Sequence, residues 1–388
     1  MPEAADNIEN LPAGAALREG ALVVDEVLSQ SQFAITYRGR DTRLAREVAI
    51  KEYFPLGCAR RDGLVQPRAS IADEFERAKT QFLDEARVLA QFRHPGIVGV
   101  FDFFAENNTT YMVMEFLAGQ TLEALLQNGA LPPPVAIEYI LKIGQALEIV
   151  HAAAILHCDI KPENIMVCAG ETERVALIDF GLTKRLDESQ SYNTRRLNDA
   201  AHFGTPGYAP IEQYTHSAQI GAYTDVYALG ATLYRLLTNV VPASAADRAA
   251  GAAWTPPHAL NPKVGRGLSR IIEWAMQMAP AARPSSVVDW LGRLSFVEEE
   301  EQLRLAFLAT LQARIRHQEY CFARESTPVF APNRIAPPVS RPQRAEPEYL
   351  TDDSGCLHAC FIGCLLFWFI GAALAFVGWG VRYLFVGG

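Results

Sequence analysis

The segment ILHCDIKPENIMV, residues 155–167, places three different polar groups in one short loop bounded by apolar residues. Asp159 contributes a carboxylate, Lys161 an ammonium group and Asn164 a neutral carboxamide. Because the three residues are so close in sequence, we expect their side chains to lie on one wall of a cleft. The loop is therefore the first candidate for a functional site.

A second motif follows in the chain. The apolar run 175–178 predicts a strand, and it ends at Asp179-Phe180-Gly181, where the glycine permits the backbone to turn away. An isolated Asp-Phe-Gly is typical of an ordinary turn after a strand. In this order and spacing after residues 155–167, the two motifs indicate a single site. The Asp179 carboxylate can bind Mg²⁺, and Asn164 can offer a second, neutral oxygen to it.

These groups match the needs of phosphoryl transfer from ATP, which requires bound phosphates, a metal ion and a correctly aimed hydroxyl. Asp159 can accept the proton of that hydroxyl, and Lys161 can neutralise the γ-phosphate. The run Val48-Ala49-Ile50-Lys51 places a lysine on a strand, where it can meet the α and β phosphates if a carboxylate fixes its position. Glu85, on the helix that follows, is the expected carboxylate. Either Lys51 or Glu85 alone would be read as a surface charge.

The secondary-structure pattern predicts two lobes of unlike class around these motifs. Short runs rich in β-branched and aromatic residues predict five strands, and a helix over residues 71–92, capped by Ser70, separates the third from the fourth. Between residues 117 and 294 the pattern is mostly helical. The expected fold class is α+β, with a small β-rich lobe that holds one helix and a larger helical lobe. The strand runs are ALVVDEVLS (21–29), ITYRGRD (35–41), EVAIKEYF (47–54), IVGVFDFF (97–104) and TYMVMEFL (110–117).

Composition limits the class of protein. The 388 residues, 49% of them hydrophobic, suffice for a large core and suggest two or three units. A net charge of -9 without a cluster of Lys and Arg argues against a nucleic-acid partner. Seven scattered cysteines predict a reducing compartment, and the first residues lack the pattern of a secretory signal. We expect the first three quarters of the chain to lie in the cytoplasm.

The last quarter of the chain has a different character. Residues 297–326 predict an amphipathic helix, and residues 327–358 predict a Pro-rich juxtamembrane linker. Residues 359–381 carry no charge and would reach about 35 Å as a helix, enough to cross a hydrocarbon core of ~30 Å. A buried helix is the alternative, but core helices usually show a polar face. We expect one transmembrane helix at 359–381 and a short tail at 382–388.

Small residues recur along this predicted transmembrane helix. Cys360, Cys364, Gly371 and Ala375 lie near one helical face, and small residues at four-residue spacing let two helices approach closely. A homodimer through this face is a hypothesis. The alternative is a face that contacts only lipid.

Residues 22–294 resemble the protein kinase superfamily, specifically the bacterial eukaryotic-like (Hanks-type) Ser/Thr kinases. VAIKEYFP, FRHPGIV, HCDIKPENIMV, DFG, GTPGYAPIEQY and TDVYALGATLYRLLT occur in the family's order. The resemblance implies a bilobal fold, with an N-lobe at 18–116 and a C-lobe at 117–296, after a disordered N-terminus at 1–17. Together with the predicted transmembrane helix, it predicts a single-pass protein of the bacterial inner membrane with its kinase domain in the cytoplasm. Its reaction would use ATP and Mg²⁺ to phosphorylate Ser or Thr of protein substrates.

The resemblance also assigns roles within the nucleotide site. Asp159 would be the catalytic base, and Asn164 and Asp179 would hold Mg²⁺. Met114 would be the gatekeeper, the residue at the back of the adenine pocket. Glu115 to Leu117 would form the hinge, the segment that joins the lobes and binds adenine.

Further roles implied by the resemblance lie in the C-lobe. Glu212 would pair with Arg283, and Asp225 would brace the catalytic loop from a buried helix. The lysine of DIKPEN is typical of the Ser/Thr subclass, and Thr205 stands where the family contacts the acceptor residue.

The sequence departs from the family at the glycine-rich loop that should cover the phosphates. The aligned stretch reads Ser29-Gln30-Ser31-Gln32-Phe33-Ala34, so Ser29, Ser31 and Ala34 replace the three glycines as nucleotide-binding positions. A stiffer loop predicts weaker ATP binding or slower turnover, although the Ser31 hydroxyl could donate to a phosphate. The alternative is a pseudokinase scaffold with weakened or absent turnover. A small-molecule phosphotransferase fits less well, because GTPGYAPIEQY resembles a peptide-docking surface.

A second departure is Cys158, at a position where many kinases have an arginine that binds a phosphorylated activation loop. A thiol cannot form that charge-assisted pair. We therefore expect activity that does not depend on phosphorylation within residues 182–205.

Overall fold

The computed structural model describes residues 10–168, 173–180, 184–185, 204–215, 219–297, 307 and 310–316. All of them belong to the first of two compact units, Met1–Glu319. The predicted linker, transmembrane helix and tail lie outside the described residues, as do residues 1–9 and most of the predicted helix at 297–326, in which residues 310–316 are helical. Within the described residues, no helix combines the length and apolar character needed to cross a bilayer.

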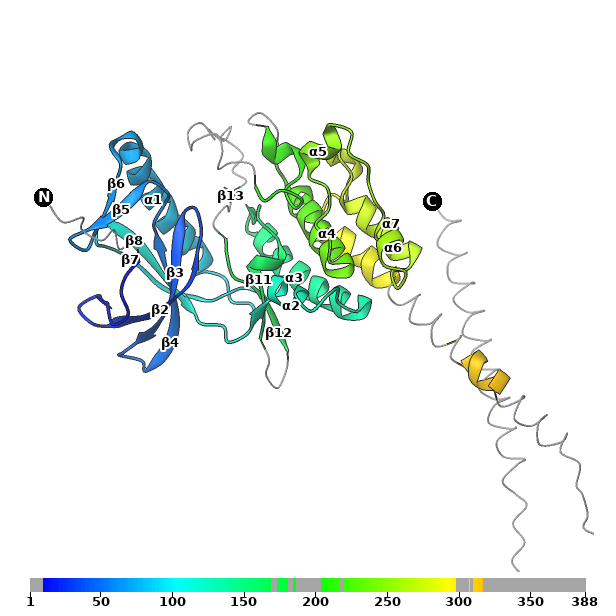
Figure 1. Ribbon diagram of the computed structural model, residues 1–388, viewed down its shortest axis with the longest axis horizontal. Coiled ribbons are helices and arrows are strands. Elements are labelled where there is room, and N and C mark those ends of the chain that lie inside the picture. Colours follow the sequence, from blue (N-terminus) through cyan, green and yellow to red (C-terminus); the bar gives the residue numbers. More distant parts are fainter. Residues whose placement is uncertain are drawn as a thin grey trace, which may run out of the picture. The chain divides into compact units, whose positions relative to one another are not determined.

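Six antiparallel strands form the main sheet of the N-lobe, in the order β1-β2-β3-β4-β8-β7 (Figure 1). The five predicted strands are confirmed as β2, β3, β4, β7 and β8. From Val48 to Tyr53 every residue of β4 is buried, so both faces of this strand are covered. The strands are β1 Ala16–Leu17, β2 Leu22–Gln30, β3 Ala34–Asp41, β4 Arg46–Tyr53, β7 Val100–Glu106 and β8 Thr109–Glu115.

The helix α1, Ala72–Leu89, carries a buried stripe that contacts the sheet at β7 and β8. Residues spaced by three or four positions lie on one helix face, and the buried residues Phe75, Ala78, Phe82, Ala86 and Leu89 follow that spacing. The expected cap at Ser70 was wrong. A 3₁₀ turn, Ala69–Ile71, precedes the helix, and no side chain caps its first turn.

A β-hairpin that our sequence analysis did not predict lies between β4 and α1. Its strands are β5, Cys58–Arg61, and β6, Leu64–Pro67. The two turn residues, Asp62 and Gly63, have φ angles of 51° and 79°. Asp-Gly between two strands is a strong signal for such a turn, so the sequence did contain the information.

The hairpin is tied to β4 by a buried cluster around Glu52, the neighbour of Lys51. Glu52 is fully buried and accepts hydrogen bonds from Tyr111 Oη (2.7 Å), Tyr37 Oη (2.8 Å) and Arg60 Nη2 (2.6 Å). Every carboxylate oxygen therefore has a partner, as a buried charge requires. Successive strand residues point to opposite faces, so this cluster lies behind the face of β4 that carries Lys51.

The C-lobe is mainly helical, with short strands where it meets the N-lobe. The most buried of its described helices is α4, in which every residue from Thr224 to Tyr234 is buried. The helices are α2 Leu122–Leu126, α3 Pro133–Ala152, α4 Ala222–Thr238, α5 Ala245–Ala249, α6 Pro257–Leu260 and α7 Arg266–Ala275, followed by helical residues 287–297. The strands are β9 Gln120–Thr121, β10 Ile155–Leu156, β11 Ile165–Cys168, β12 Arg174–Leu177 and β13 Lys184–Arg185. Three 3₁₀ turns cover Pro162–Asn164, Ile211–Tyr214 and Pro280–Ala282.

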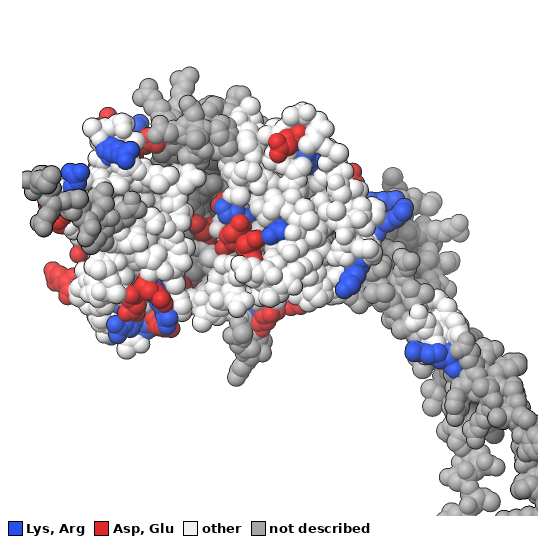
Figure 2. Space-filling model, in the orientation of Figure 1, with Lys and Arg blue, Asp and Glu red and all other residues white. Residues whose placement is uncertain are grey.

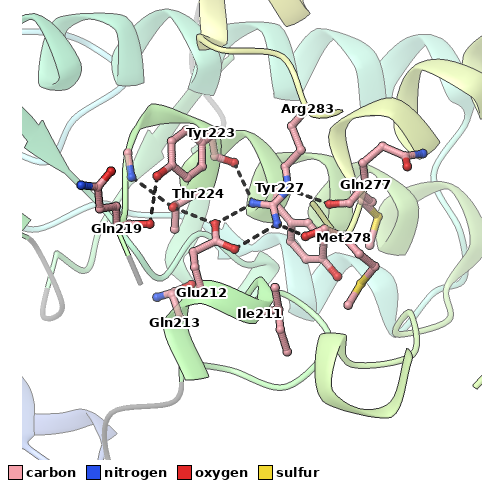
Figure 3. A network of polar contacts seen from close by, with 12 residues as sticks. Ile211, Glu212, Gln213, Gln219, Tyr223, Thr224, Tyr227, Gln277, Met278 and Arg283 are labelled. Atoms are coloured by element: carbon pink, nitrogen blue, oxygen red, sulfur yellow. Dashed lines mark hydrogen bonds and ion pairs between the residues drawn. The ribbon is translucent and has the colours of Figure 1, made fainter. Parts of the chain in front are cut away.

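The predicted pair of Glu212 and Arg283 is confirmed, and it lies at the centre of a buried network (Figure 3). Arg283 Nη1 and Nη2 donate to the two Glu212 carboxylate oxygens at 2.6 and 3.0 Å. Arg283 also donates to the carbonyls of Gln277 and Met278, and Thr224 Oγ1 donates to Glu212. The network joins the turn at 211–214, α4 and the segment after α7.

On the face drawn in Figure 2, several groups of surface charges combine acidic and basic side chains. Exposed pairs such as Arg40 with Asp25 contribute little to stability, because water screens them.

Candidate active site

The catalytic loop, residues 157–164, is held from below by Asp225 of α4, as expected. Asp225 is fully buried and accepts hydrogen bonds from the amides of His157 (2.9 Å) and Cys158 (2.8 Å). His151 Nε2 lies 2.8 Å from the same carboxylate and helps to keep the pKa of Asp225 below its ordinary value, although burial acts in the opposite direction. Cys158 has a φ of 64°, a conformation that few non-glycine residues adopt. The bonds to Asp225 fix this strained turn.

The predicted catalytic residues come together around the Asp159 carboxylate. Thr205 Oγ1 donates to Asp159 Oδ1 at 2.8 Å, while Lys161 Nζ lies 2.9 Å from Oδ2. Lys161 Nζ also donates to Thr205 Oγ1 at 2.7 Å. Asn164 Nδ2 donates to Asp159 Oδ2 at 3.0 Å. The carboxylate is thus already placed to accept a hydrogen bond from a hydroxyl group, next to a cation.

Lys51 and Asp179 meet across the two lobes. The Lys51 ammonium, on β4, lies 2.6 Å from Asp179 Oδ1 at the end of β12. Burial alone would lower the pKa of Lys51, but the nearby carboxylates of Asp179 and Glu85 raise it above its ordinary value. Lys51 is therefore charged at neutral pH. The next residue, Phe180, is buried with its ring 4.6 Å from the His157 ring, which anchors the Asp179 backbone to the catalytic loop.

The expected ion pair between Lys51 and Glu85 is not formed, because Lys51 pairs with Asp179 instead. One Glu85 carboxylate oxygen is buried without a hydrogen-bond partner in the described part of the chain. Burial raises the pKa of Glu85 to about 8, and the attraction of Lys51 only partly offsets this. Both residues were predicted from the sequence, but residue spacing does not specify which carboxylate the lysine contacts.

The raised pKa makes stability depend on pH through Glu85. The folded chain holds a proton up to about pH 8, whereas the unfolded chain releases it near 4.5. The stability that protonated Glu85 provides is fully present below the pKa of Glu85 in the unfolded chain. It is lost as pH rises through the pKa of Glu85 in the folded chain. Glu85→Gln stays neutral, so its free energy of unfolding should exceed that of the wild type by a few kcal/mol near pH 8.5 and by less near pH 5.5. Urea titrations at both pH values measure this, and an equal difference at both would contradict the raised pKa.

The hinge lies where β8 ends. Met114 is buried, as expected of a gatekeeper position, and the Leu117 amide donates to no described residue. Arg174 of β12 pairs with Glu115, with Nη2 2.9 Å from Oε2, and Arg174 Nε donates to the Pro95 carbonyl at 2.7 Å. Hydrogen bonding to Arg174 lowers the pKa of Glu115. Arg174 was not identified from the sequence, because no motif marks it.

The residues that replace the glycines occupy different environments. Ser29 lies exposed on β2 opposite Thr36, Ser31 lies in the turn that follows, and Ala34 is buried at the start of β3. The Ser31 hydroxyl donates to the Ala34 carbonyl at 3.2 Å, so the predicted donation to a phosphate would require that bond to break.

The predicted metal ligands suit a Mg²⁺ ion that is bound together with a nucleotide. Asn164 Nδ2 donates to Asp159 at both its backbone and carboxylate oxygens, which orients the amide oxygen away from that residue. Asp179 adds a partly exposed carboxylate. Among the residues that the structure describes, no three His, Cys, Asp or Glu side chains converge to hold a metal by themselves. Mg²⁺ commonly takes one or two carboxylates and completes its shell with phosphates and water, so the residues present fit this ion.

Comparison with known proteins agrees with this geometry. The protein kinase domain model matches residues 64–289, more than half of the chain, so the chain belongs to the protein kinase family. The match begins after Lys51 and the turn that contains Ser31. The curated relatives are of the bacterial Ser/Thr kind, in agreement with the resemblance to Hanks-type kinases.

Two relatives show the extent of the similarity. A probable serine/threonine-protein kinase of Clostridium perfringens is 29% identical over 79% of this chain and 42% of its own length. The serine/threonine-protein kinase pkn3 of Myxococcus xanthus is 32% identical over 72% of this chain and 50% of its own length. The chain thus spans about half or less of these relatives.

Solved structures show the same bilobal fold. PpkA-294 in its apo form gives a TM-score of 0.61 at 29% identity, covering 74% of this chain and 99% of that one. The kinase domain of Mycobacterium tuberculosis PknI, as a double mutant, gives a TM-score of 0.57 at 20% identity, covering 74% and 98%. The second similarity concerns the fold alone.

Proposed function

We propose that this chain is a Ser/Thr protein kinase that transfers the γ-phosphoryl group of ATP to proteins with the help of Mg²⁺. The observation that carries the proposal is the hydrogen bond from the Thr205 hydroxyl to Asp159, with Lys161 bonded to both. Asp159 thus accepts a hydrogen bond from a hydroxyl group with the Lys161 ammonium beside it, which supports its role toward an acceptor hydroxyl.

Each residue then has a definite task. Asp159 orients the acceptor hydroxyl and takes its proton, while Lys161 neutralises charge on the transferred group. Lys51 binds the phosphates, and Asn164 and Asp179 would hold Mg²⁺, which when bound neutralises phosphate charge. The Leu117 amide, which donates to no described residue, would donate to adenine. Asp225 and Phe180 keep these groups in position.

The pseudokinase alternative gains nothing from the comparisons, because the relatives are named as kinases. The set Lys51, Asp159, Asn164 and Asp179 is complete and converges in one place. The turn that contains Ser31, the missing Lys51–Glu85 ion pair and Cys158 are the departures from expectation.

The acceptor class can be tested directly. The full chain, incubated with γ-labelled ATP, Mg²⁺ and a generic protein substrate, should yield labelled phosphoserine or phosphothreonine after acid hydrolysis. Label confined to phosphotyrosine would contradict the assignment of acceptor class but leave the kinase assignment intact.

We also propose that residues 359–381 anchor the kinase domain to a membrane, with the domain in the cytoplasm and its substrates nearby. The uncharged length of this segment supports the proposal. The full chain should stay in bacterial membranes after alkaline carbonate washing, whereas a chain ending at residue 358 should be released. Release of both would contradict the anchor.

Crosslinking at Cys364 in those membranes tests the proposed homodimer, and monomer alone would refute it.

A further inference from the structure

The turn between β2 and β3, Ser31–Ala34, is closed by the Ser31 side chain. The Ser31 hydroxyl oxygen accepts hydrogen bonds from the amides of Phe33 (3.3 Å) and Ala34 (3.1 Å). The same hydroxyl donates to the Ala34 carbonyl at 3.2 Å, and the Ser31 amide donates to that carbonyl at 2.8 Å. The Ser31 hydroxyl oxygen thus accepts from two amides of the turn. The one hydrogen atom of this hydroxyl is donated to the Ala34 carbonyl.

The other side of this turn is tied to the chain that leaves β4. The Phe54 amide donates to the Phe33 carbonyl at 2.9 Å, and the Leu56 amide donates to the Gln32 carbonyl at 2.9 Å. These bonds extend the pairing of β3 with β4, in which Ala34 lies opposite Tyr53. The carbonyls of the turn are therefore held by backbone hydrogen bonds from the chain after β4, and two of its amides are held by the Ser31 side chain.

When a turn of this kind covers a nucleotide, its backbone amides are the groups that bind the phosphates. Backbone N–H groups that point to a common centre form an anion site, and charged acceptors make stronger hydrogen bonds than neutral ones. A serine oxygen at that centre is a neutral acceptor built into the chain. A phosphate must displace it before it can bind the amides of Phe33 and Ala34.

We propose that the Ser31 hydroxyl competes with the nucleotide phosphates for the amides of Phe33 and Ala34, and so lowers the affinity for ATP. The inference rests on the proposed function, because it concerns the same nucleotide. Ser31 would affect how tightly the nucleotide binds, whereas Asp159 would affect the rate of phosphoryl transfer. The replacement of glycine by serine then acts through an added acceptor as well as through lost flexibility.

The test compares Ser31→Ala with Ser31→Thr, which keeps a hydroxyl at the same place. Gln32→Ala is the matched control, since it removes a neighbouring exposed side chain and leaves Ser31 intact.

Adenosine, ADP and Mg-ATP are titrated into each full-length protein by calorimetry. Removing the hydroxyl should tighten ADP and Mg-ATP about three- to tenfold, because two amides become available to a charged acceptor. Adenosine affinity should stay within about twofold, since it has no phosphate. Ser31→Thr and Gln32→Ala should match the wild type.

Steady-state kinetics provide a second readout. The KM for ATP should fall in Ser31→Ala with kcat nearly unchanged, as expected when uniform binding is gained. The proposal is overturned if Ser31→Ala binds Mg-ATP no tighter than Ser31→Thr, or if adenosine tightens equally. A wild type that binds neither ATP nor ADP would instead refute the proposed function.

Discussion

Asp159→Asn is expected to lower the rate of phosphoryl transfer by about 10²- to 10⁴-fold, the usual contribution of a general base. Asparagine keeps the size of the side chain but cannot take the proton of an acceptor hydroxyl. The affinity for Mg-ATP should stay within about twofold, because Lys51 and Asp179 are unchanged. The loss should therefore appear in kcat and leave nucleotide binding intact.

Single-turnover transfer with γ-labelled ATP, beside calorimetric titration of the nucleotide, separates the two effects. Asp289→Asn, an exposed aspartate at 287–297, is the matched control for the same chemical change. If Asp159→Asn transfers phosphate at the wild-type rate, Asp159 is not the catalytic base. A parallel loss of ATP binding would show that the substitution disturbs the whole site.

Arg283→Met is expected to destabilise the fold by about 3–5 kcal/mol, because it leaves the Glu212 carboxylate buried without its cation. The arginine side chain is fully buried, and it also donates to the carbonyls of Gln277 and Met278. For a domain of this size, the melting temperature should fall by roughly 6–20 °C. Thermal unfolding followed by circular dichroism measures the change.

Two comparisons make this prediction specific. Arg270→Met replaces an exposed arginine on α7 and should leave the melting temperature nearly unchanged. The double variant Glu212→Gln with Arg283→Met removes the unpaired charge and should recover part of the loss. If Arg283→Met costs less than about 1 kcal/mol, the buried network does not hold the C-lobe together.

The residues with clear sequence motifs were placed correctly in space. Asp159, Lys161 and Asn164 are close in sequence, so a single loop conformation brings them together. Asp179 follows a buried strand that pairs with β11, the strand that continues from the catalytic loop, and the pairing fixes its place. For these residues, local spacing and strand pairing suffice to predict the site.

Other features depend on contacts that spacing cannot reveal. Lys51 has two carboxylates within reach, and the contact with Asp179 depends on the relative placement of α1 and β12. Arg174 reaches Glu115 from a distant strand. The bonds of Ser31 depend on where one side chain points in a turn, and no residue pattern specifies that direction. The β5–β6 hairpin is different, because its Asp62-Gly63 signal was present and was missed.

The most direct test of the central claim is transfer of label from γ-labelled ATP to a protein by the purified full chain. The wild type should transfer label with Mg²⁺ present, and it should transfer none when EDTA removes the metal. Asp179→Ala should also transfer none, because it loses the carboxylate that meets Lys51 and would hold Mg²⁺. Transfer by the wild type that does not exceed that of Asp179→Ala would contradict the assignment of this site as a working kinase.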